Sequence, residues 1–142
     1  MHKLIKGVPI LKKAIHHICI QTNHYERSKQ FYLNLGFELY KETPGFHTRS
    51  YNSWLRLGDF YIELQTAKKG SSLQPFNKES ESIVHFCLYV ENLNEEVARM
   101  EALNIPFQLK NGQSVYFVES GYLAKIIAPE GTIIELRDNP IL

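Results

Sequence analysis

The sequence has 142 residues, of which 44% are hydrophobic and 22% charged, with a formal net charge of +1. This length fits one domain that can bury a core, and the charge gives no reason to expect nucleic acid or an anionic membrane as a partner. No apolar run is long enough to span a bilayer or to serve as a signal peptide, and two cysteines cannot form a disulfide scaffold. We therefore expect a cytoplasmic protein with free thiols.

Residues 1–13 have no counterpart in the rest of the chain. They combine apolar residues such as Leu4, Val8 and Leu11 with several lysines, and we predict an N-terminal arm or an extra strand. Residues 14–142 are predicted to form a single domain built from two repeated modules, 14–66 and 82–138.

The first module begins with a predicted strand over 15–21. A helix is predicted over 25–34, because Ser28, Phe31 and Tyr32 fall on one side at helical spacing and Gly36 follows as a typical helix end. Alternation of apolar and polar residues then predicts strands over 37–40, 51–57 and 60–65.

The second module repeats this order after a linker over 67–81 that is rich in Lys, Gly, Ser and Pro. Strands are predicted over 83–90, 106–109, 113–119, 122–128 and 132–137. A helix is predicted over 93–102, with a buried side formed by Leu93, Val97, Met100 and Leu103. The fold class is therefore α+β, with two β-α-β-β-β modules forming curved mixed sheets around a cleft.

A histidine and a glutamate recur at matching places in both modules. His17 and Glu63 lie on predicted strands of the first module, and His85 and Glu135 on those of the second. Because side chains alternate along a strand, these residues point away from neighbours such as Ile62 and Ile134, which can pack against the helices. The polar face of each sheet reads as the lining of a cleft.

Two imidazoles and two carboxylates suit a divalent transition metal such as Zn, Ni, Mn, Co or Fe(II). Converging carboxylates repel each other, and a cation between them removes that repulsion. We therefore predict that His17, Glu63, His85 and Glu135 converge on one metal ion, which would act as a Lewis acid for an oxygenated substrate, and that a glutamate is the base.

The order of these residues, together with the segments over 26–37 and 128–136, resembles the vicinal oxygen chelate superfamily. That superfamily contains glyoxalase I, methylmalonyl-CoA epimerase, extradiol dioxygenases, and fosfomycin and bleomycin resistance proteins, and the resemblance covers residues 14–138. The ligand set is most like that of glyoxalase I, a metal-dependent isomerase of a hemithioacetal. By position, the resemblance implies Glu135 as the proton-transferring residue, with Glu63 as its partner across the metal.

Glyoxalase I enzymes commonly hold glutathione with an arginine and an asparagine at the positions of Gln21 and Ala67, so the sequence argues against glutathione as the thiol. The candidate substrate-binding residues are Gln21, Tyr61, Tyr89 and Arg137. Two alternatives remain open, a small-molecule (antibiotic-type) binding protein without turnover and an Fe(II) dioxygenase of the same fold. The dioxygenases typically lack the glutamate that corresponds to Glu63.

Three further predictions concern the surroundings of these residues. Cys19 and Cys87 are expected to be small core residues, and His16 to be structural because it points away from His17. The resemblance also implies a homodimer, and the metal site could then form within one chain or between two chains.

Overall fold

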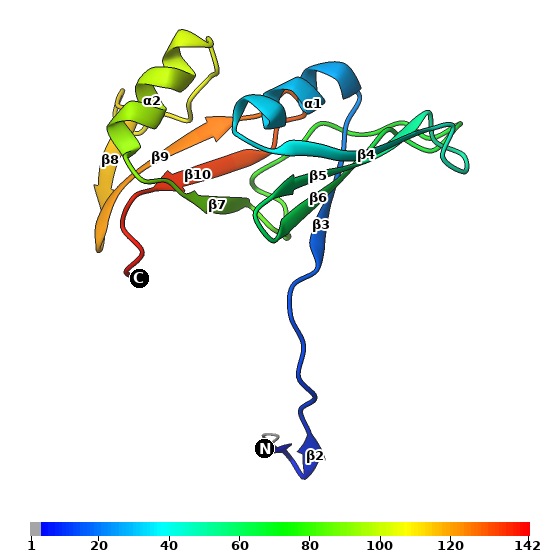
Figure 1. Ribbon diagram of the computed structural model, residues 1–142. Coiled ribbons are helices and arrows are strands. Elements are labelled where there is room, and N and C mark those ends of the chain that lie inside the picture. Colours follow the sequence, from blue (N-terminus) through cyan, green and yellow to red (C-terminus); the bar gives the residue numbers. More distant parts are fainter. Residues whose placement is uncertain (1–3) are drawn as a thin grey trace.

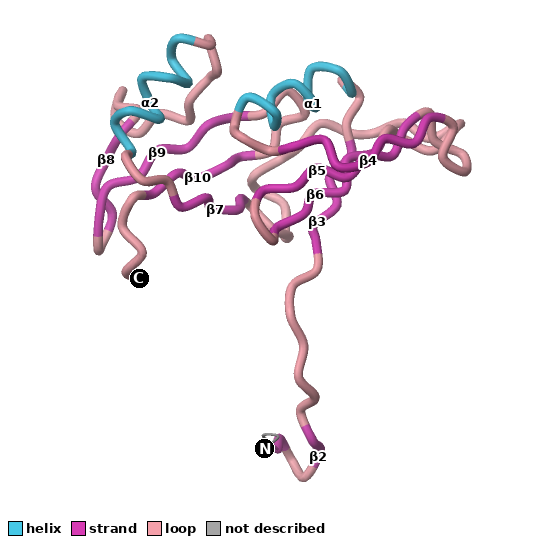
Figure 2. The backbone as a smooth tube through the Cα atoms, viewed as in Figure 1, coloured by secondary structure: helices cyan, strands magenta, loops and turns pink. Residues whose placement is uncertain are grey.

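The computed structural model describes residues 4–142. Strands β1 (Leu4–Ile5) and β2 (Val8–Pro9) pair as a small antiparallel hairpin, and residues 10–16 run from it as an extended segment to the first large sheet. This arm stands clear of the other elements (Figures 1 and 2), and Leu4, Val8 and Leu11 are each more than 60% exposed. Residues 1–3 of the predicted arm lie outside the described residues.

The first module follows the predicted order closely. It contains β3 (His17–Gln21), α1 (Tyr25–Asn34), β4 (Glu38–Pro44), β5 (Tyr51–Leu57) and β6 (Phe60–Gln65), and its sheet has the order β3-β6-β5-β4. Gly36 has φ of +106°, which lets the chain turn sharply after the helix. The main difference from prediction is β4, which continues four residues further than expected because it pairs with the whole of β5.

The second module contains β7 (His85–Tyr89), α2 (Leu93–Ala102), β8 (Val115–Val118), β9 (Gly121–Ile127) and β10 (Ile133–Arg137), in the sheet order β7-β10-β9-β8. The predicted strand over 106–109 is wrong, because only an isolated bridge from Phe107 to Ile126 forms there. Backbone pairing of this segment with β9 consists of the Ile127 N–H donating to the Pro106 carbonyl and the Gln108 N–H donating to the Lys125 carbonyl, each at 2.9 Å, and Pro106 has no N–H to extend the ladder. Leu103 was also predicted to be buried and is 43% exposed, since it lies beyond the last turn of α2.

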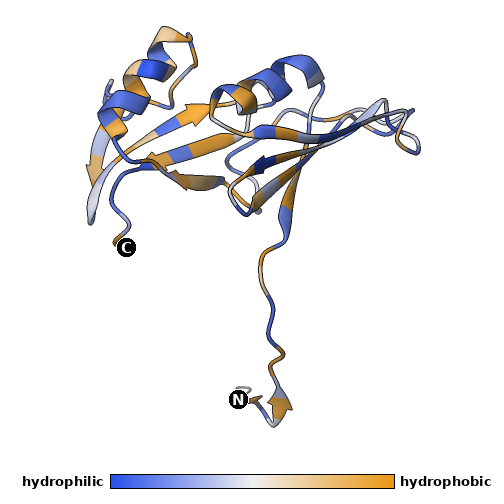
Figure 3. Cartoon of the chain, in the orientation of Figure 1, coloured by the Kyte–Doolittle hydropathy of each residue, from blue (hydrophilic) through white to orange (hydrophobic). Residues whose placement is uncertain are grey.

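Both helices lie on the same side of the two sheets (Figure 1), and one hydrophobic core fills the space beneath them. Ile62 and Leu64 of β6 and Ile134 and Leu136 of β10 are almost completely buried in that core. Apolar residues recur along the strands beneath the helices (Figure 3), as the alternating pattern predicts. The opposite faces of the sheets, which carry the histidines and glutamates, point away from the helices.

Glu130 joins the two modules. This residue lies in the turn before β10, yet its carboxylate accepts hydrogen bonds from Ser28 (2.7 Å) and Tyr32 (2.6 Å) of α1. Both hydroxyl-bearing residues are fully buried. Burial, followed by the Glu130 charge, raises the pKa of Tyr32 well above its usual value, so Tyr32 stays a hydrogen-bond donor.

Asn92 caps the N-terminus of α2, because its side-chain oxygen accepts a hydrogen bond from the backbone N–H of Glu95 at 3.0 Å. We expect Asn92→Ala to destabilise the protein by about 1 kcal/mol, the usual cost of losing such a cap. Urea denaturation measures this change, with Asn94→Ala on the exposed side of the same helix as the control. Equal stability of the two variants would contradict a capping role.

Candidate functional site

Each module positions one histidine beside one glutamate on neighbouring parallel strands. In the first module, His17 Nε2 lies 3.6 Å from Glu63 Oε1, and in the second, His85 Nε2 lies 3.4 Å from Glu135 Oε1. The parallel register is the same in both sheets, with Cys19 opposite Glu63 and Cys87 opposite Glu135. The duplicated sequence pattern therefore produces two copies of one local geometry, which we call the first and second His–Glu pairs.

The two pairs differ in what holds the glutamate. Arg137 Nε donates a hydrogen bond of 2.8 Å to Glu135 Oε2, so one carboxylate oxygen is fixed by the arginine and the other faces His85. Glu135 is only 8% exposed. Arg137, a candidate substrate anchor from the sequence, thus lies where it orients Glu135.

The two histidines also have different surroundings. His16 Nδ1 lies 2.8 Å from His17 Nδ1, so one imidazole donates to the other and fixes the orientation of the ring. His85 Nδ1 is buried and has no hydrogen-bond partner among the described residues. His16, which sequence reasoning had treated as structural only, is therefore a direct neighbour of the first pair.

The structure brings the four candidate ligands together two by two. Across residues 4–142, no group of three or more His, Cys, Asp or Glu side chains is placed to hold a metal ion. Among the described residues, the four candidate ligands therefore lie as two separate His–Glu pairs, and we call each pair a candidate half-site. The convergence expected from the sequence is not reached within a single chain.

The donor set of each half-site fits a divalent metal ion. Two ligands that are each about 2.1 Å from one ion, at an angle of about 90° to 110°, are themselves about 3.0 to 3.4 Å apart. The His–Glu separations of 3.6 and 3.4 Å are close to this range. Each half-site supplies one imidazole nitrogen and one carboxylate oxygen, and two half-sites together supply the four donors predicted from the sequence.

The expectation that the cysteines are core residues is wrong, because Cys19 and Cys87 are both exposed. They lie on the open faces of the sheets beside the glutamates. Partial desolvation of each thiol, and then the nearby carboxylate of Glu63 or Glu135, raises its pKa to about 11. Both thiols are therefore protonated near neutral pH and are poor nucleophiles.

We expect iodoacetamide at pH 8 to alkylate Cys19 and Cys87 about tenfold more slowly than N-acetylcysteine, because the smaller thiolate fraction outweighs the higher intrinsic reactivity of a more basic thiolate. Glu63→Gln removes a negative charge beside Cys19 only and should accelerate its alkylation, while Cys87 serves as the internal control. Peptide mapping by mass spectrometry measures both rates. Alkylation at the rate of free cysteine in the unsubstituted protein would contradict the raised pKa.

The remaining candidate substrate residues lie around the two pairs. Gln21 accepts a hydrogen bond of 2.9 Å from Arg49, whose guanidinium also contacts the carbonyl oxygen of Thr66 at 2.6 Å. The Arg49 guanidinium therefore lies beside Gln21. Arg49 belongs to a loop, and no periodic pattern in the sequence predicts this position for it. Tyr61 is half-buried next to His16, whereas Tyr89 is 62% exposed at the end of β7.

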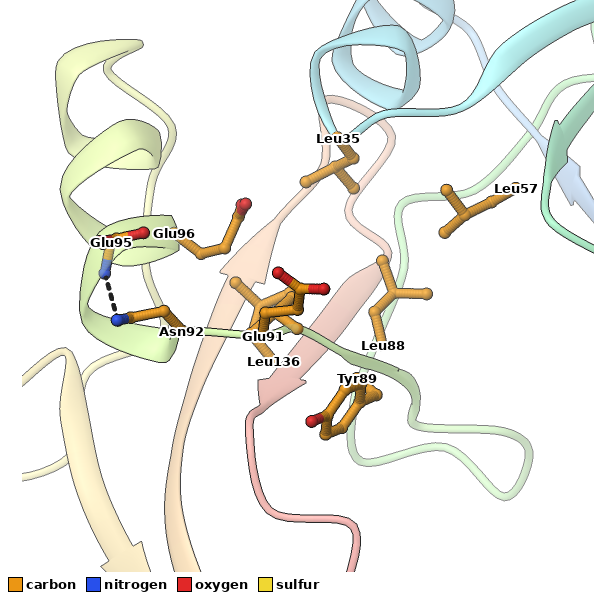
Figure 4. Close-up of a pocket in the computed structure, with 10 residues that line it drawn as sticks. Leu35, Leu57, Leu88, Tyr89, Glu91, Asn92, Glu95, Glu96 and Leu136 are labelled. Atoms are coloured by element: carbon orange, nitrogen blue, oxygen red, sulfur yellow. Dashed lines mark hydrogen bonds between the residues drawn. The ribbon is translucent and has the colours of Figure 1, made fainter.

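A cavity of about 620 Å³ lies apart from both pairs. Figure 4 shows side chains that line it, among them the apolar Leu35, Leu57, Leu88 and Leu136 and the acidic Glu91, Glu95 and Glu96. Leu88 and Leu136 point to the helix side of the second sheet, opposite to His85 and Glu135. This cavity therefore does not include the candidate metal ligands.

Each of the two repeated modules carries a His–Glu pair on parallel strands. The chain is therefore a duplicated α+β protein, and its paired side chains are of the kinds that bind metal ions. The chain belongs to the Glyoxalase/Bleomycin resistance protein/Dioxygenase superfamily, whose family model matches residues 15–117. It is 34% identical over 98 residues to the uncharacterized protein YwkD of Bacillus subtilis (strain 168), a match that covers 68% of this chain and 76% of YwkD.

Two solved structures share the fold at lower identity. The trypanothione-dependent glyoxalase I of Leishmania major is 23% identical, with a TM-score of 0.68 over 89% of this chain and 88% of the other. A mutant of the fosfomycin resistance protein FosX of Listeria monocytogenes, complexed with Mn(II), is 15% identical, with a TM-score of 0.68 over 92% of this chain and 94% of the other. The fold predicted from the sequence is confirmed.

Proposed function

We propose that the protein is a metal-dependent, glyoxalase-like lyase or isomerase that acts on a small oxygenated substrate by proton abstraction and enediolate stabilisation. The observation that carries this proposal is the recurrence of the same His–Glu pair in both modules. His17, Glu63, His85 and Glu135 are the proposed ligands of one divalent ion, whether Zn, Ni, Mn, Co or Fe. Such an ion would act as a Lewis acid that stabilises negative charge developing on substrate oxygens.

We propose further that two chains complete the site. The first pair of one chain would meet the second pair of a partner chain across a two-fold axis, which makes two equivalent sites in a homodimer. The open sheet faces that carry Cys19, Cys87 and Tyr89 support this arrangement, because their exposure in a single chain leaves a surface for a partner to cover.

In the proposed reaction, a glutamate takes a proton from a hydroxyl-bearing carbon next to a carbonyl group and returns it to the carbonyl carbon. The hydroxyl proton passes to the former carbonyl oxygen, so no oxidant or reductant is consumed. Glu135 is the proposed base, and Glu63 is its proposed partner across the metal. Arg137 holds Glu135 Oε2, so Glu135 Oε1 is the oxygen that would bind the ion and, on loosening from it, accept the proton. A fixed orientation of this oxygen favours transfer to one face of the substrate.

Elemental analysis after loading with Ni, Zn, Mn or Co tests the metal site. We expect one ion per chain, which is lost in His17→Ala and in Glu135→Gln but retained in His24→Ala, a substitution at an exposed histidine outside both pairs. Exchange of a carbon-bound proton for deuterium, followed by NMR on hemithioacetals of several thiols, tests the reaction.

Three outcomes separate the proposal from its alternatives. Absence of bound metal under every loading condition would overturn the metal-dependent function. A ligand that raises the thermal stability but never changes chemically would favour a binding protein without turnover. Oxygen consumption with Fe(II) would favour a dioxygenase.

A further inference from the structure

Four aromatic side chains and one lysine line an open hollow of about 330 Å³ beside the first His–Glu pair. The lining residues are His16, Tyr40, Lys41, Trp54 and Tyr61. We call this hollow the aromatic box. Its volume is in the range of small-molecule sites, and its walls come from the end of the arm and from three strands of the first sheet.

Three rings of the aromatic box have a regular arrangement, in which two rings are nearly parallel and the third is perpendicular to both. The His16 and Tyr61 rings are nearly parallel, with an angle of 22° between their planes and centroids 6.5 Å apart. The Trp54 ring stands almost perpendicular to both, at 82° to His16 and 79° to Tyr61, with centroid distances of 6.4 and 6.5 Å.

This spacing is suited to one flat group. Carbon atoms in contact are about 3.5 Å apart, so a ring held between two parallel rings separates them by about 7 Å. The His16 and Tyr61 centroids are 6.5 Å apart, about 0.5 Å less than that value, so a flat ring fits once the exposed His16 ring shifts outward by about that amount. The edge of the inserted ring would then meet Trp54, whose plane is nearly perpendicular to both rings. Edge-to-face contact is a preferred arrangement of aromatic rings.

The charge at the rim favours an anionic ligand. Lys41 is the one charged side chain among the lining residues, and no ion pair of the described chain includes it. Arg56 lies 5.1 Å from the Tyr40 ring, but it is paired with Glu38 at 3.1 Å. A cationic ligand would meet repulsion from Lys41, whereas a carboxylate would gain a partner.

The aromatic box is also in direct contact with the first pair. The His17 ring lies 4.7 Å from the Trp54 ring, and His16 contacts His17 through its Nδ1 atom. A flat group in the box would therefore be separated from His17, a proposed metal ligand, by about the width of one ring. The remainder of the same molecule could reach them.

We propose that the aromatic box binds a planar aromatic group bearing an anionic substituent, and that this group is the specificity-determining part of the substrate. The flat ring lies between His16 and Tyr61, and the anion lies at Lys41. This substrate class rests on the proposed function, whereas binding to the box does not require the metal.

The chain has a single tryptophan, Trp54, so its fluorescence reports on the aromatic box and on the adjoining His17. We expect benzoate to change this fluorescence saturably in metal-free protein, and cyclohexanecarboxylate and benzyltrimethylammonium to bind more weakly. Tyr61→Ala should weaken benzoate binding about tenfold, the upper range for loss of a stacked aromatic partner. Lys41→Met should weaken it about fivefold, as expected for an exposed ion pair.

Tyr122→Ala, an exposed tyrosine of the second module, is the matched control and should leave the benzoate affinity unchanged. Lys41 is exposed, so Lys41→Met provides a test even if Tyr61→Ala does not fold. Equal binding of benzoate and cyclohexanecarboxylate, or unchanged affinity in both box variants, would overturn the proposal.

Turnover separates this inference from the proposed function. With one thiol, we expect the hemithioacetal of phenylglyoxal to be preferred over that of methylglyoxal, and Tyr61→Ala to reduce the ratio of kcat/KM values about tenfold. Benzoate binding without turnover of any hemithioacetal would refute the proposed function but leave the box as an anionic aromatic site. Turnover without any aromatic preference would refute the role of the box in specificity.

Discussion

Mixing two defective variants, His17→Ala and His85→Ala, is expected to restore metal binding that neither variant has alone. In the proposed two-fold dimer, each site combines the first pair of one chain with the second pair of its partner. In a mixed dimer, one site therefore carries both substitutions and the other site carries neither. Random pairing makes half of the dimers mixed, so about a quarter of the normal number of sites should be recovered. Elemental analysis of the refolded mixture measures this fraction.

The matched control is a mixture of His17→Ala with Glu63→Gln. Both substitutions affect the first pair, so every site of a mixed dimer keeps one defect and no recovery is expected. Native mass spectrometry with one variant tagged verifies that mixed dimers form. Mixed dimers without recovered metal in the first experiment would contradict a site shared between chains.

Replacing Glu130 with alanine is expected to destabilise the fold by about 3 kcal/mol. The substitution leaves the buried hydroxyls of Ser28 and Tyr32 without their shared acceptor, and hydrogen bonds to a charged group contribute about 1.5 to 3 kcal/mol. Because these bonds join the turn before β10 to α1, their loss weakens the packing of one module against the other. Urea denaturation gives the free energy of unfolding.

Two variants control this experiment. Glu130→Gln keeps one carbonyl acceptor and should lose less stability than Glu130→Ala. Glu101→Ala, at an exposed position of α2, should change the stability by less than about 0.5 kcal/mol. A loss in Glu130→Ala no greater than in Glu101→Ala would show that the contact between modules is energetically unimportant.

The fold could be predicted because its signals are local and are repeated. Ile62 and Leu64 have their counterparts in Ile134 and Leu136, and all four are buried as the alternating pattern requires. Both helices begin and end as predicted. The segment over 106–109 differs from the prediction because its backbone pairing with β9 stops after the bonds of Pro106 and Gln108, and an apolar pattern does not show where such pairing stops.

The candidate site could be predicted only in its parts. The strand pattern identified the His–Glu pairs, but sequence spacing carries no information on whether two modules meet within one chain or between chains. Cys19 and Cys87 were mispredicted because their apolar neighbours suggested a core, yet their face of each sheet is open in a single chain. The sequence does not indicate Arg49 or Lys41 as site residues, because the residues that lie near them in space are distant in the sequence.

The position of His16 connects the N-terminal arm to the aromatic box. This residue is the last of the extended segment before β3, so one ring of the box belongs to a segment whose far end stands clear of the two sheets. The box and the candidate metal ligands thus differ in origin: His16 comes from outside the two sheets, whereas all four candidate ligands lie on their strands.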